Sequence, residues 1–183
     1  EDTNPAGVYF LNKGKVKTSK VNPDGKEFIT ALLNAGEFFG YGALLEEKAY
    51  TDSAVALEDA EIYFIPKEDF FSLLYNRHDV ASAFIRMLSN EVKEKEERLL
   101  RLAYNSVRKR VAEALLHLRS RYAAQKTDQF SMAISREDLA NLAGTAQETV
   151  IRTLSDFKDE KLITIKGSLI TLLDVGKLER MKN

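Results

Sequence analysis

Residues 135–157 read SREDLANLAGTAQETVIRTLSDF, and this stretch decides the fold of the C-terminal part of the chain. Ser135 stands three positions before Asp138, a capping-box pattern that predicts the start of a short helix. Gly144 then supplies the residue for a tight turn, and Thr145 is the expected cap of a second helix. A capped helix, a glycine turn and a second helix are typical of a helix-turn-helix.

The second helix of this stretch should have an apolar side and a polar side. Val150, Leu154 and Phe157 recur at spacings of four and three, so they should face inward. The opposite side carries, near the start of the helix, Gln147, Glu148, Ile151 and Arg152. A helix-turn-helix places these positions of its second helix against base edges in the major groove of DNA. The plainer alternative is an ordinary pair of packed helices.

The polar side has residue types that recognise bases. Arg152 can donate two hydrogen bonds to guanine, Glu148 can accept one from cytosine, and Gln147 can pair with adenine. Ile151 lies beside them and completes the set of candidate base-reading residues. Candidate contacts to DNA phosphates, which position a protein without reading sequence, are Ser135, Arg136 and Thr149. For Arg136 the alternative is an exposed arginine of the first helical turn that has no partner.

The net charge of −1 hides a difference between the two parts of the chain. Residues 105–183 contain 14 Lys and Arg against 10 Asp and Glu, a net charge of +4. Residues 1–104 contain the other 13 against 18, a net charge of −5. A basic part joined to an acidic part suits a polyanionic partner, although such charges are also common on solvated surfaces.

The composition excludes several kinds of site. The 183 residues are 44% hydrophobic and 30% charged, as in globular proteins, and they contain no cysteine for disulfides, thiolate catalysis or metal clusters. His78 and His117 stand far apart, so we expect no metal site and no cofactor. We expect His78 on the surface and His117 partly packed against the core. Walker-type phosphate loops and nucleophile elbows are missing, so an enzyme is not expected.

The sequence shown has neither a run of eighteen apolar residues nor a signal peptide. We therefore expect no membrane partner and a cytoplasmic location. The chain begins at Glu1 without a methionine, in what looks like the middle of a folded unit, so we also expect a segment upstream of it.

Residues 1–65 show the pattern of short strands and turns. The expected strands span 8–11, 16–21, 28–33, 53–57 and 62–65, and Asn22-Pro23-Asp24-Gly25 is a strong hairpin signal. Many short strands at close spacing predict an antiparallel barrel or jelly roll. Because no helical segments separate these strands, a parallel α/β sheet is not expected.

A short helix from Pro66 through Leu74 should be followed by a much longer helix over 79–103. In the long helix a seam repeats at alternating spacings of three and four: Ile85, Leu88, Val92, Lys95, Leu99 and Leu102. This heptad pattern favours a coiled-coil dimer helix. The alternative is a helix that packs only on its own strands. Glu91 and Lys95 are spaced to form an ion pair along the helix.

Asn105-Ser106 interrupts the helical pattern, and its serine can cap a new helix that runs to about Ala124. After the two helices described first, a hairpin of 162–165 and 169–172 is expected about Gly167. Three helices and a hairpin make a winged helix-turn-helix. The expected fold is α+β, with an N-terminal antiparallel β-roll over 1–78, a long dimerisation helix over 79–104 and a C-terminal winged helix-turn-helix over 105–183.

Several motifs, in one order along nearly the whole chain, resemble the catabolite-activator and fumarate–nitrate-regulator (Crp/Fnr) family of bacterial transcription factors. Gly36-Glu37-Phe38-Phe39-Gly40 is similar to the turn that enters the family's effector-binding cassette. Residues 102–107, followed by Arg110-Val111-Ala112, resemble its interdomain hinge and first DNA-domain helix. Residues 134–140 and 147–152 resemble its helix-turn-helix.

The resemblance implies a homodimer joined by the long helix, a sensory β-roll and control of transcription, with double-stranded DNA and RNA polymerase as partners. The family's shared base readers are a glutamate and the arginine four positions later, which match Glu148 and Arg152. Gln147 stands where the catabolite-activator branch has arginine, so the half-site should differ there. A dimer should bind an inverted repeat with half-sites roughly 34 Å apart. The alternative is a ligand-responsive module that acts through protein partners without DNA.

The resemblance also locates an effector pocket, made of Phe39, Gly40, Tyr41, Asp52, Ser53, Lys95 and Glu96. The cyclic-nucleotide branch binds cyclic AMP through an arginine to the phosphate, a glutamate to the ribose and a threonine–serine pair on the long helix. Asp52 stands here in the place of the arginine, Tyr41 in that of the glutamate, and Lys95-Glu96 in that of the pair. An aspartate repels a phosphate, so we expect no cyclic AMP binding, and the effector is unknown.

Other branches of the family hold an iron–sulfur cluster or a haem. The cluster needs cysteines, and these residues contain none. A haem would need His78, for which a solvated surface position is the better explanation.

Overall fold

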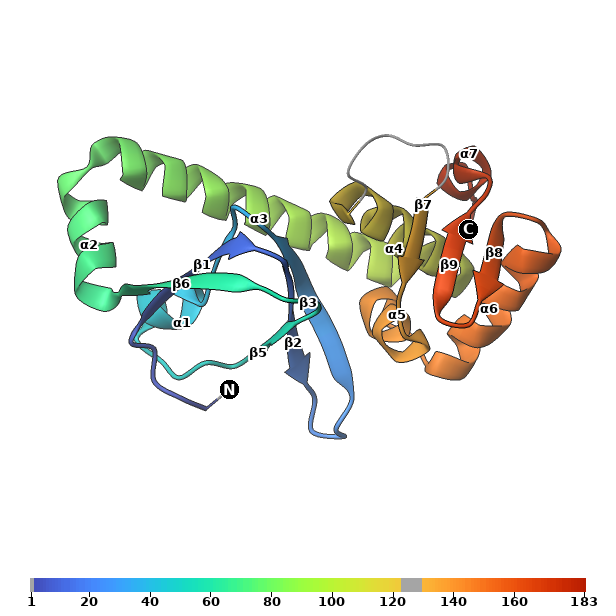
Figure 1. Ribbon diagram of the computed structural model, residues 1–183, viewed down its shortest axis with the longest axis horizontal. Helices are drawn as coiled ribbons and strands as arrows, with labels where there is room; N and C mark the ends of the chain where they lie inside the picture. The colour runs from blue at the N-terminus through green and yellow to red at the C-terminus, as the bar shows by residue number, and fades with distance from the viewer. Residues whose placement is uncertain (1, 123–129) are drawn as a thin grey trace. The chain divides into compact units, whose positions relative to one another are not determined.

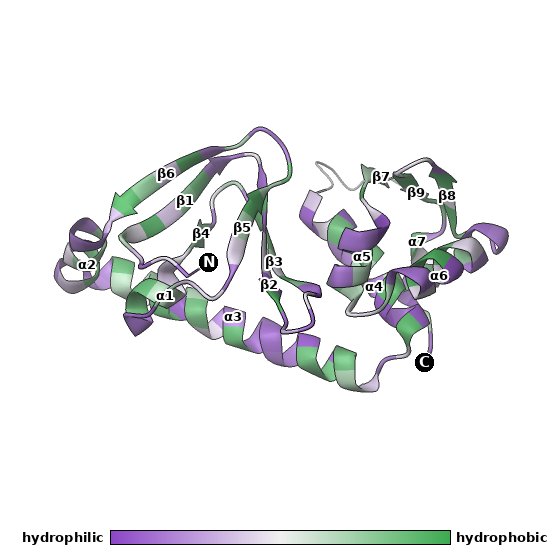
Figure 2. Cartoon of the chain, turned by 90° about the horizontal axis from the view of Figure 1, so that it is seen from below, coloured by the Kyte–Doolittle hydropathy of each residue, from purple (hydrophilic) through white to green (hydrophobic). Residues whose placement is uncertain are grey.

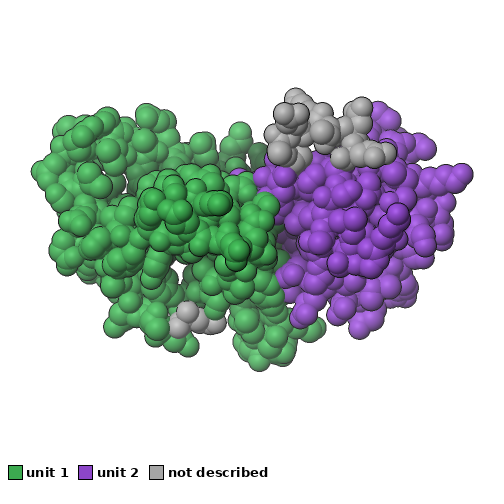
Figure 3. All heavy atoms as spheres, in the orientation of Figure 1, with its two compact units in different colours: residues 1–98 green, residues 99–183 purple. Residues whose placement is uncertain are grey.

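The computed structural model describes residues 2–122 and 130–183 and divides into two compact units, residues 1–98 and 99–183 (Figure 3). Among the described residues, no helix has the length and apolar character needed to cross a membrane.

Unit 1 is built on short strands, as the sequence predicts. They are β1 (Gly7–Lys13), β2 (Lys15–Val21), β3 (Glu27–Asn34), β4 (Phe38–Phe39), β5 (Ser53–Ala56) and β6 (Glu61–Pro66). One sheet has the order β4-β1-β6 and another the order β3-β2-β5, and their pairings are antiparallel. The sequence reasoning did not predict β4 or the helix α1 (Tyr41–Glu46), which are too short to show a periodic pattern.

The predicted hairpin turn after β2 is confirmed. The side chain of Asn22 accepts hydrogen bonds from the backbone N–H of Asp24 at 3.0 Å and of Lys26 at 2.8 Å. Gly25 has a φ of 76°, a conformation that glycine adopts without steric cost. This turn sets the β2–β3 register, in which Val21 lies opposite Glu27.

The strands enclose an apolar core, and α2 (Lys67–Asn76) closes part of it. Leu11, Val16, Leu33 and Phe39 form one buried cluster. Val8, Leu44 and Phe70 form another, in which α2 supplies the phenylalanine. The helix begins after Pro66, as predicted, and ends two residues beyond the predicted Leu74.

The long helix α3 (His78–Tyr104) packs on unit 1 through Phe84 and Arg98. The Phe84 ring lies edge-on to Phe70 and to Tyr41, each with ring centroids 5.4 Å apart. Arg98 donates hydrogen bonds to the carbonyl oxygens of Ile29 at 2.6 Å and Thr30 at 3.0 Å. In Figure 1 the part of α3 that belongs to unit 1 runs along the strands.

The predicted seam of α3 leaves apolar side chains in solvent. The exposed fractions of Ile85, Val92 and Leu99 are 66%, 56% and 66%. Leu88 and Leu102 are half-buried, and no residue of α3, which the structure describes throughout, is fully buried. Figure 2 shows apolar and polar residues alternating along this helix. The predicted ion pair of Glu91 and Lys95 is present at 3.7 Å.

Unit 2 contains the predicted three helices and hairpin. In chain order its elements are α4 (Val107–Tyr122), β7 (Phe130–Ala133), α5 (Arg136–Ala143), α6 (Gln147–Asp159), β8 (Ile163–Lys166), β9 (Leu169–Leu172) and α7 (Val175–Glu179). Ser106 caps α4 as predicted, since its hydroxyl accepts from the N–H of Lys109 at 3.3 Å. The predicted end of α4 at Ala124 lies outside the described residues.

The hairpin is one edge of a larger sheet than the sequence predicted. β7, which was not predicted, pairs with β9 and gives the antiparallel order β7-β9-β8. Gly167 turns the β8–β9 hairpin with a φ of 61°. The core beneath this sheet includes Leu115 from α4, Leu139 from α5 and Leu154 from α6.

Candidate nucleic-acid interface

Helix α5 starts at the predicted cap. The Ser135 hydroxyl accepts a hydrogen bond from the N–H of Asp138 at 2.8 Å, and Ser135 Oγ lies 2.7 Å from Asp138 Oδ2. The capping interaction holds Ser135 at the start of the helix, where the chain leaves the sheet. Its hydroxyl is exposed but already serves the cap, and its contact with a phosphate stays a prediction.

The turn between α5 and α6 differs from the prediction in the residue that caps α6. Gly144 ends α5 in the left-handed region, with a φ of 64°, as its sequence position indicated. Thr145 does not cap α6, because its N–H still donates to the Ala140 carbonyl of the preceding helix at 3.1 Å. The N-cap is Ala146, whose carbonyl accepts from the N–H groups of Thr149 and Val150 at 3.1 Å each.

Helix α6 has the two sides that the sequence predicted. Val150, Leu154 and Phe157 are buried, with exposed fractions of 0%, 1% and 0%. The candidate base-reading residues are all exposed: Gln147, Glu148, Ile151 and Arg152. Thr149 is half-buried, and its carbonyl accepts from the Thr153 hydroxyl at 2.8 Å. Within the described part of the chain, no hydrogen bond or ion pair joins Glu148 to Arg152, so both side chains are open to a ligand.

An arginine of α4 holds the turn that precedes α6. Arg110 Nη1 donates to the carbonyl oxygens of Ala143 at 3.0 Å and Gly144 at 2.8 Å. These carbonyls lie at the C-terminal end of α5, where an intrahelical donor is lacking and a cation is favourable. The sequence reasoning assigned no role to Arg110, although it belongs to a motif that carried the family resemblance.

A second arginine of α4 holds the other end of α6. Arg108 Nη2 lies 2.6 Å from both carboxylate oxygens of Glu160, and Arg108 Nη1 lies 3.8 Å from Asp156. Its guanidinium carbon stands 4.8 Å from the centre of the Phe157 ring. Arg108 therefore joins α4 to the C-terminal end of α6, while Arg110 joins α4 to the turn that precedes α6. Sequence reasoning missed both contacts.

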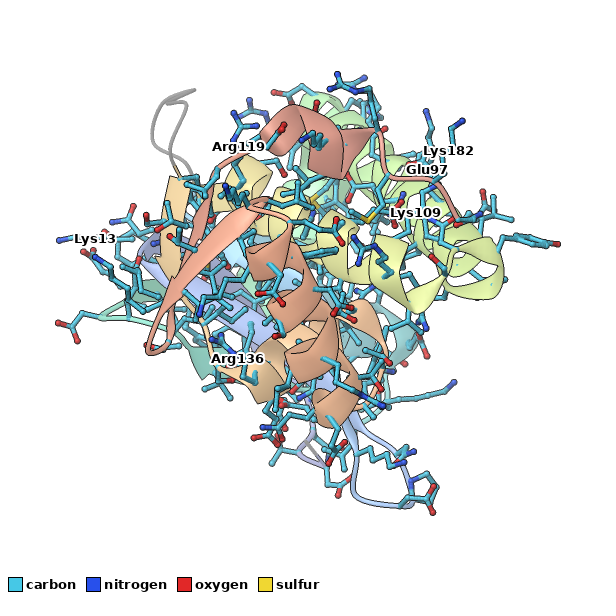
Figure 4. All side chains as sticks on the ribbon, turned by 90° about the vertical axis from the view of Figure 1, so that its right-hand side faces the viewer. Lys13, Glu97, Lys109, Arg119, Arg136 and Lys182 are labelled. Atoms are coloured by element: carbon cyan, nitrogen blue, oxygen red, sulfur yellow. The ribbon has the colours of Figure 1, made fainter. Side chains whose placement is uncertain are left out.

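Arg136 connects α5 to the hairpin turn. It is half-buried, and its Nη2 donates to the Gly167 carbonyl at 3.1 Å (Arg136 is labelled in Figure 4). A neighbouring backbone hydrogen bond joins the N–H of Ile134 to the Ser168 carbonyl at 3.3 Å. The alternative of an exposed arginine without a partner is therefore wrong. Its predicted phosphate contact is untested.

In unit 1 two of the residues predicted for an effector pocket, Tyr41 and Lys95, contact Glu91 of the long helix. The Tyr41 hydroxyl donates a hydrogen bond to Glu91 of α3. Burial, and then Glu91, raises the pKa of Tyr41, and Asp52 adds a smaller effect in the same direction. Asp52 thus lies close enough to act on this phenol. Glu91 was not predicted as a pocket residue, although its spacing to Lys95 placed it on the same side of the helix.

The other predicted pocket residues have different surroundings. Gly40 precedes α1 with a φ of 79°, and a β-carbon there would come within 3.0 Å of the Tyr9 ring. Phe39 is buried, and Ser53 pairs with Ser19 in the sheet. Lys95 reaches Glu91, while its side chain is 73% exposed, and the neighbouring Glu96 is also exposed. Three carboxylates, those of Glu91, Glu37 and Asp52, act on the Tyr41 phenol.

The two histidines lie apart from these sites. His78 is exposed at the start of α3, as predicted. His117 is also exposed, so the expectation that it packs partly against the core is wrong. The core side of α4 is occupied instead by its neighbours Leu115 and Leu118.

Comparison with known proteins agrees with the two units. The cyclic nucleotide-binding domain model matches residues 1–77, and the Crp-like helix-turn-helix domain model matches residues 109–181. The chain is 32% identical over 174 residues to the cyclic AMP receptor protein of Thermus thermophilus, covering 95% of this chain and 78% of that protein. It is 30% identical over 173 residues to the regulatory protein HlyX of Actinobacillus pleuropneumoniae, covering 93% of this chain and 72% of the relative.

The fold is similar to that of solved regulators. A crystal structure of a CRP-family transcriptional regulator from Thermus thermophilus superposes with a TM-score of 0.83 and 26% sequence identity. The match covers 97% of this chain and 88% of that one. These relatives are transcription regulators and not enzymes.

Proposed function

Since the chain belongs to the Crp/Fnr family of transcription regulators, we propose that it binds double-stranded DNA as a homodimer and reads an inverted repeat with α6. The observation that carries this proposal is the exposed start of α6, with Glu148 and Arg152 open to solvent on a helix whose other side is buried. Arg108 and Arg110 support it, because they hold the C-terminal end of that helix and the turn before its start.

The chemistry of each exposed side chain assigns its role. Arg152 donates two hydrogen bonds to guanine, Glu148 accepts one from cytosine, and Gln147 pairs with adenine. Ser135, Arg136 and Thr149 lie at or near the starts of α5 and α6, where they contact phosphates and set the register of the protein on DNA.

The dimer forms through α3. Ile85, Val92 and Leu99 are more than half exposed in the single chain and lie at seven-residue spacing. Burying such a row against the same row of a second copy removes apolar surface from water, as in a coiled coil. The two α6 helices then reach half-sites roughly 34 Å apart, one turn of DNA.

The effector of this dimer is not cyclic AMP. One relative is named a cyclic AMP receptor protein, so kinship alone does not decide the effector. The residues argue against binding of a phosphate. Asp52 contributes to the raised pKa of Tyr41, and the Tyr41 hydroxyl donates a hydrogen bond to the carboxylate of Glu91. An anion in this region would meet the carboxylates of Glu91 and Asp52, and the nearby cation, Lys95, is already paired with Glu91. Calorimetric titration with cyclic AMP should give no heat of binding, and a micromolar affinity would contradict this part of the proposal.

Selection of genomic fragments by the purified full chain, with and without metabolites from a cell extract, tests the proposed function. We expect enrichment of fragments that share an inverted repeat, and a complex with RNA polymerase on the enriched promoters. A normal dimer that shifts neither random nor genomic DNA would favour the alternative, a ligand-responsive module that acts through protein partners.

A further inference from the structure

Ile151 is the one apolar side chain among the four candidate base readers of α6. Its exposed fraction is 48%, whereas the preceding residue, Val150, is fully buried. Isolated apolar side chains are ordinary on protein surfaces, so exposure alone assigns no role. Local helix stability does not favour this residue either, because a β-branched side chain loses rotamer freedom in a helix.

The position of Ile151 on the helix is more informative. Side chains three and four positions apart are neighbours on a helix surface. Ile151 is therefore adjacent to Gln147 and Glu148 on its N-terminal side and to Ser155 on its C-terminal side, and all three are exposed. Arg152 follows directly in the chain. An apolar group thus lies inside a polar surface that we propose enters the major groove.

In the major groove, the apolar group that a base pair presents is the C5 methyl of thymine. A polar base edge would offer the isoleucine no favourable contact. The side chain would also displace the water molecules that are hydrogen-bonded to that edge. We propose that Ile151 packs against a thymine methyl and makes the protein select a T·A pair next to the base pairs read by Glu148 and Arg152. This inference rests on the proposed function and assigns one further base of the half-site.

The test removes the methyl group alone. After the operator has been selected, each thymine of the half-site is replaced in turn by uracil, which keeps the hydrogen-bonding groups. For the unmodified protein, one substitution in one half-site should weaken binding about fourfold, the equivalent of about 0.8 kcal/mol for one buried carbon group. Because Ile151→Ala changes both subunits, this variant should bind the thymine operator about as weakly as the unmodified protein binds an operator with uracil in both half-sites.

Combining the Ile151→Ala variant with the uracil operator shows whether the isoleucine and the thymine methyl contact each other. For Ile151→Ala, exchange of that thymine for uracil should change affinity less than twofold, because the contact is already lost. Ser155→Ala, on the same exposed side one turn further, is the matched control and should keep the full fourfold loss. Thermal unfolding should be unchanged for both variants, since both side chains are exposed.

The outcomes separate the inference from the proposed function. Operator binding in which every uracil substitution affects the unmodified protein and Ile151→Ala equally would overturn the role of Ile151 and leave DNA binding intact. A chain that binds no operator at all would overturn both.

Discussion

Arg152 and Arg136 carry the same charge but should contribute differently to DNA binding. Arg152 is exposed on α6, whereas Arg136 is half-buried and bound to the Gly167 carbonyl. Arg152→Ala should cost about 1–3 kcal/mol on the selected operator and relax the preference at one guanine. Arg136→Ala should weaken binding to all sequences similarly. Affinities for operators with single base changes measure both effects, and equal losses for both variants on every probe would contradict the division of roles.

Two tyrosines of unit 1 should make its stability depend on pH in the alkaline range. Burial, with smaller contributions from Tyr9 and Asp52, raises the pKa of Tyr50 from 10.0 to about 12, and burial with Glu91 raises the pKa of Tyr41. The unfolded chain releases these protons at lower pH than the folded one. The stabilisation is therefore complete below about pH 10 and is lost as the pH rises toward about 12.

Urea unfolding at a series of pH values measures this dependence. The free energy of unfolding should fall above about pH 10, and the fall should be smaller in the double variant Tyr41→Phe, Tyr50→Phe. Tyr75→Phe is the control, because Tyr75 is 77% exposed and its ring stacks on Phe71 of its own helix. An unchanged slope in the double variant would show that other groups cause the pH dependence.

At the scale of elements, α4 should determine how firmly α6 is held. The ion pair of Arg108 and Glu160 should give a coupling of about 0.5–1 kcal/mol in a double-mutant cycle of Arg108→Gln and Glu160→Gln, because the pair is partly exposed and Arg108 Nη2 reaches both carboxylate oxygens. Lys109→Gln changes the charge of α4 equally without touching Glu160 and should give no coupling. The free energy of unfolding and the operator affinity are both measured, and a coupling of zero would mean that the Arg108–Glu160 pair does not restrain α6.

The elements that the sequence predicted are those with strong local signals. The Asn22 turn, the Ser135 cap and the period of α6 each depend on residues within a few positions of one another. The missed elements β4, α1, β7 and α7 have two to six residues, too few for a period to appear. The N-cap of α6 was predicted one residue too early, at Thr145 instead of Ala146. The Thr145 N–H still donates to the Ala140 carbonyl of the preceding helix.

The contacts that orient the candidate site could not be predicted in this way. Arg110 meets Ala143 across 33 positions and Arg108 meets Glu160 across 52, and such pairs form only when the helices pack. The same applies to Tyr41 and Glu91, which are 50 positions apart. Exposure of Gln147, Glu148 and Arg152, in contrast, followed from the helical period alone.

For the whole molecule, the exposed row of α3 should determine assembly. Val92→Glu places a charge in the middle of the proposed seam, and burying it beside the same residue of a second copy would be costly. The variant should be monomeric in light scattering and should lose operator binding. Lys93→Glu, exposed and outside the seam, should remain dimeric. A Val92→Glu dimer of unchanged stability would show that α3 does not join the two copies.

Cross-linking from α6 to DNA tests most directly whether the polar side of this helix enters the groove. A photoreactive amino acid is placed at position 148 or 152, or at the exposed position 159 at the far end of the same helix, in the presence of the selected operator. We predict cross-links to bases of the half-site from positions 148 and 152 and none to bases from position 159. Cross-linking to bases from position 159 alone, or from none of the three in a protein that still binds the operator, would contradict the account.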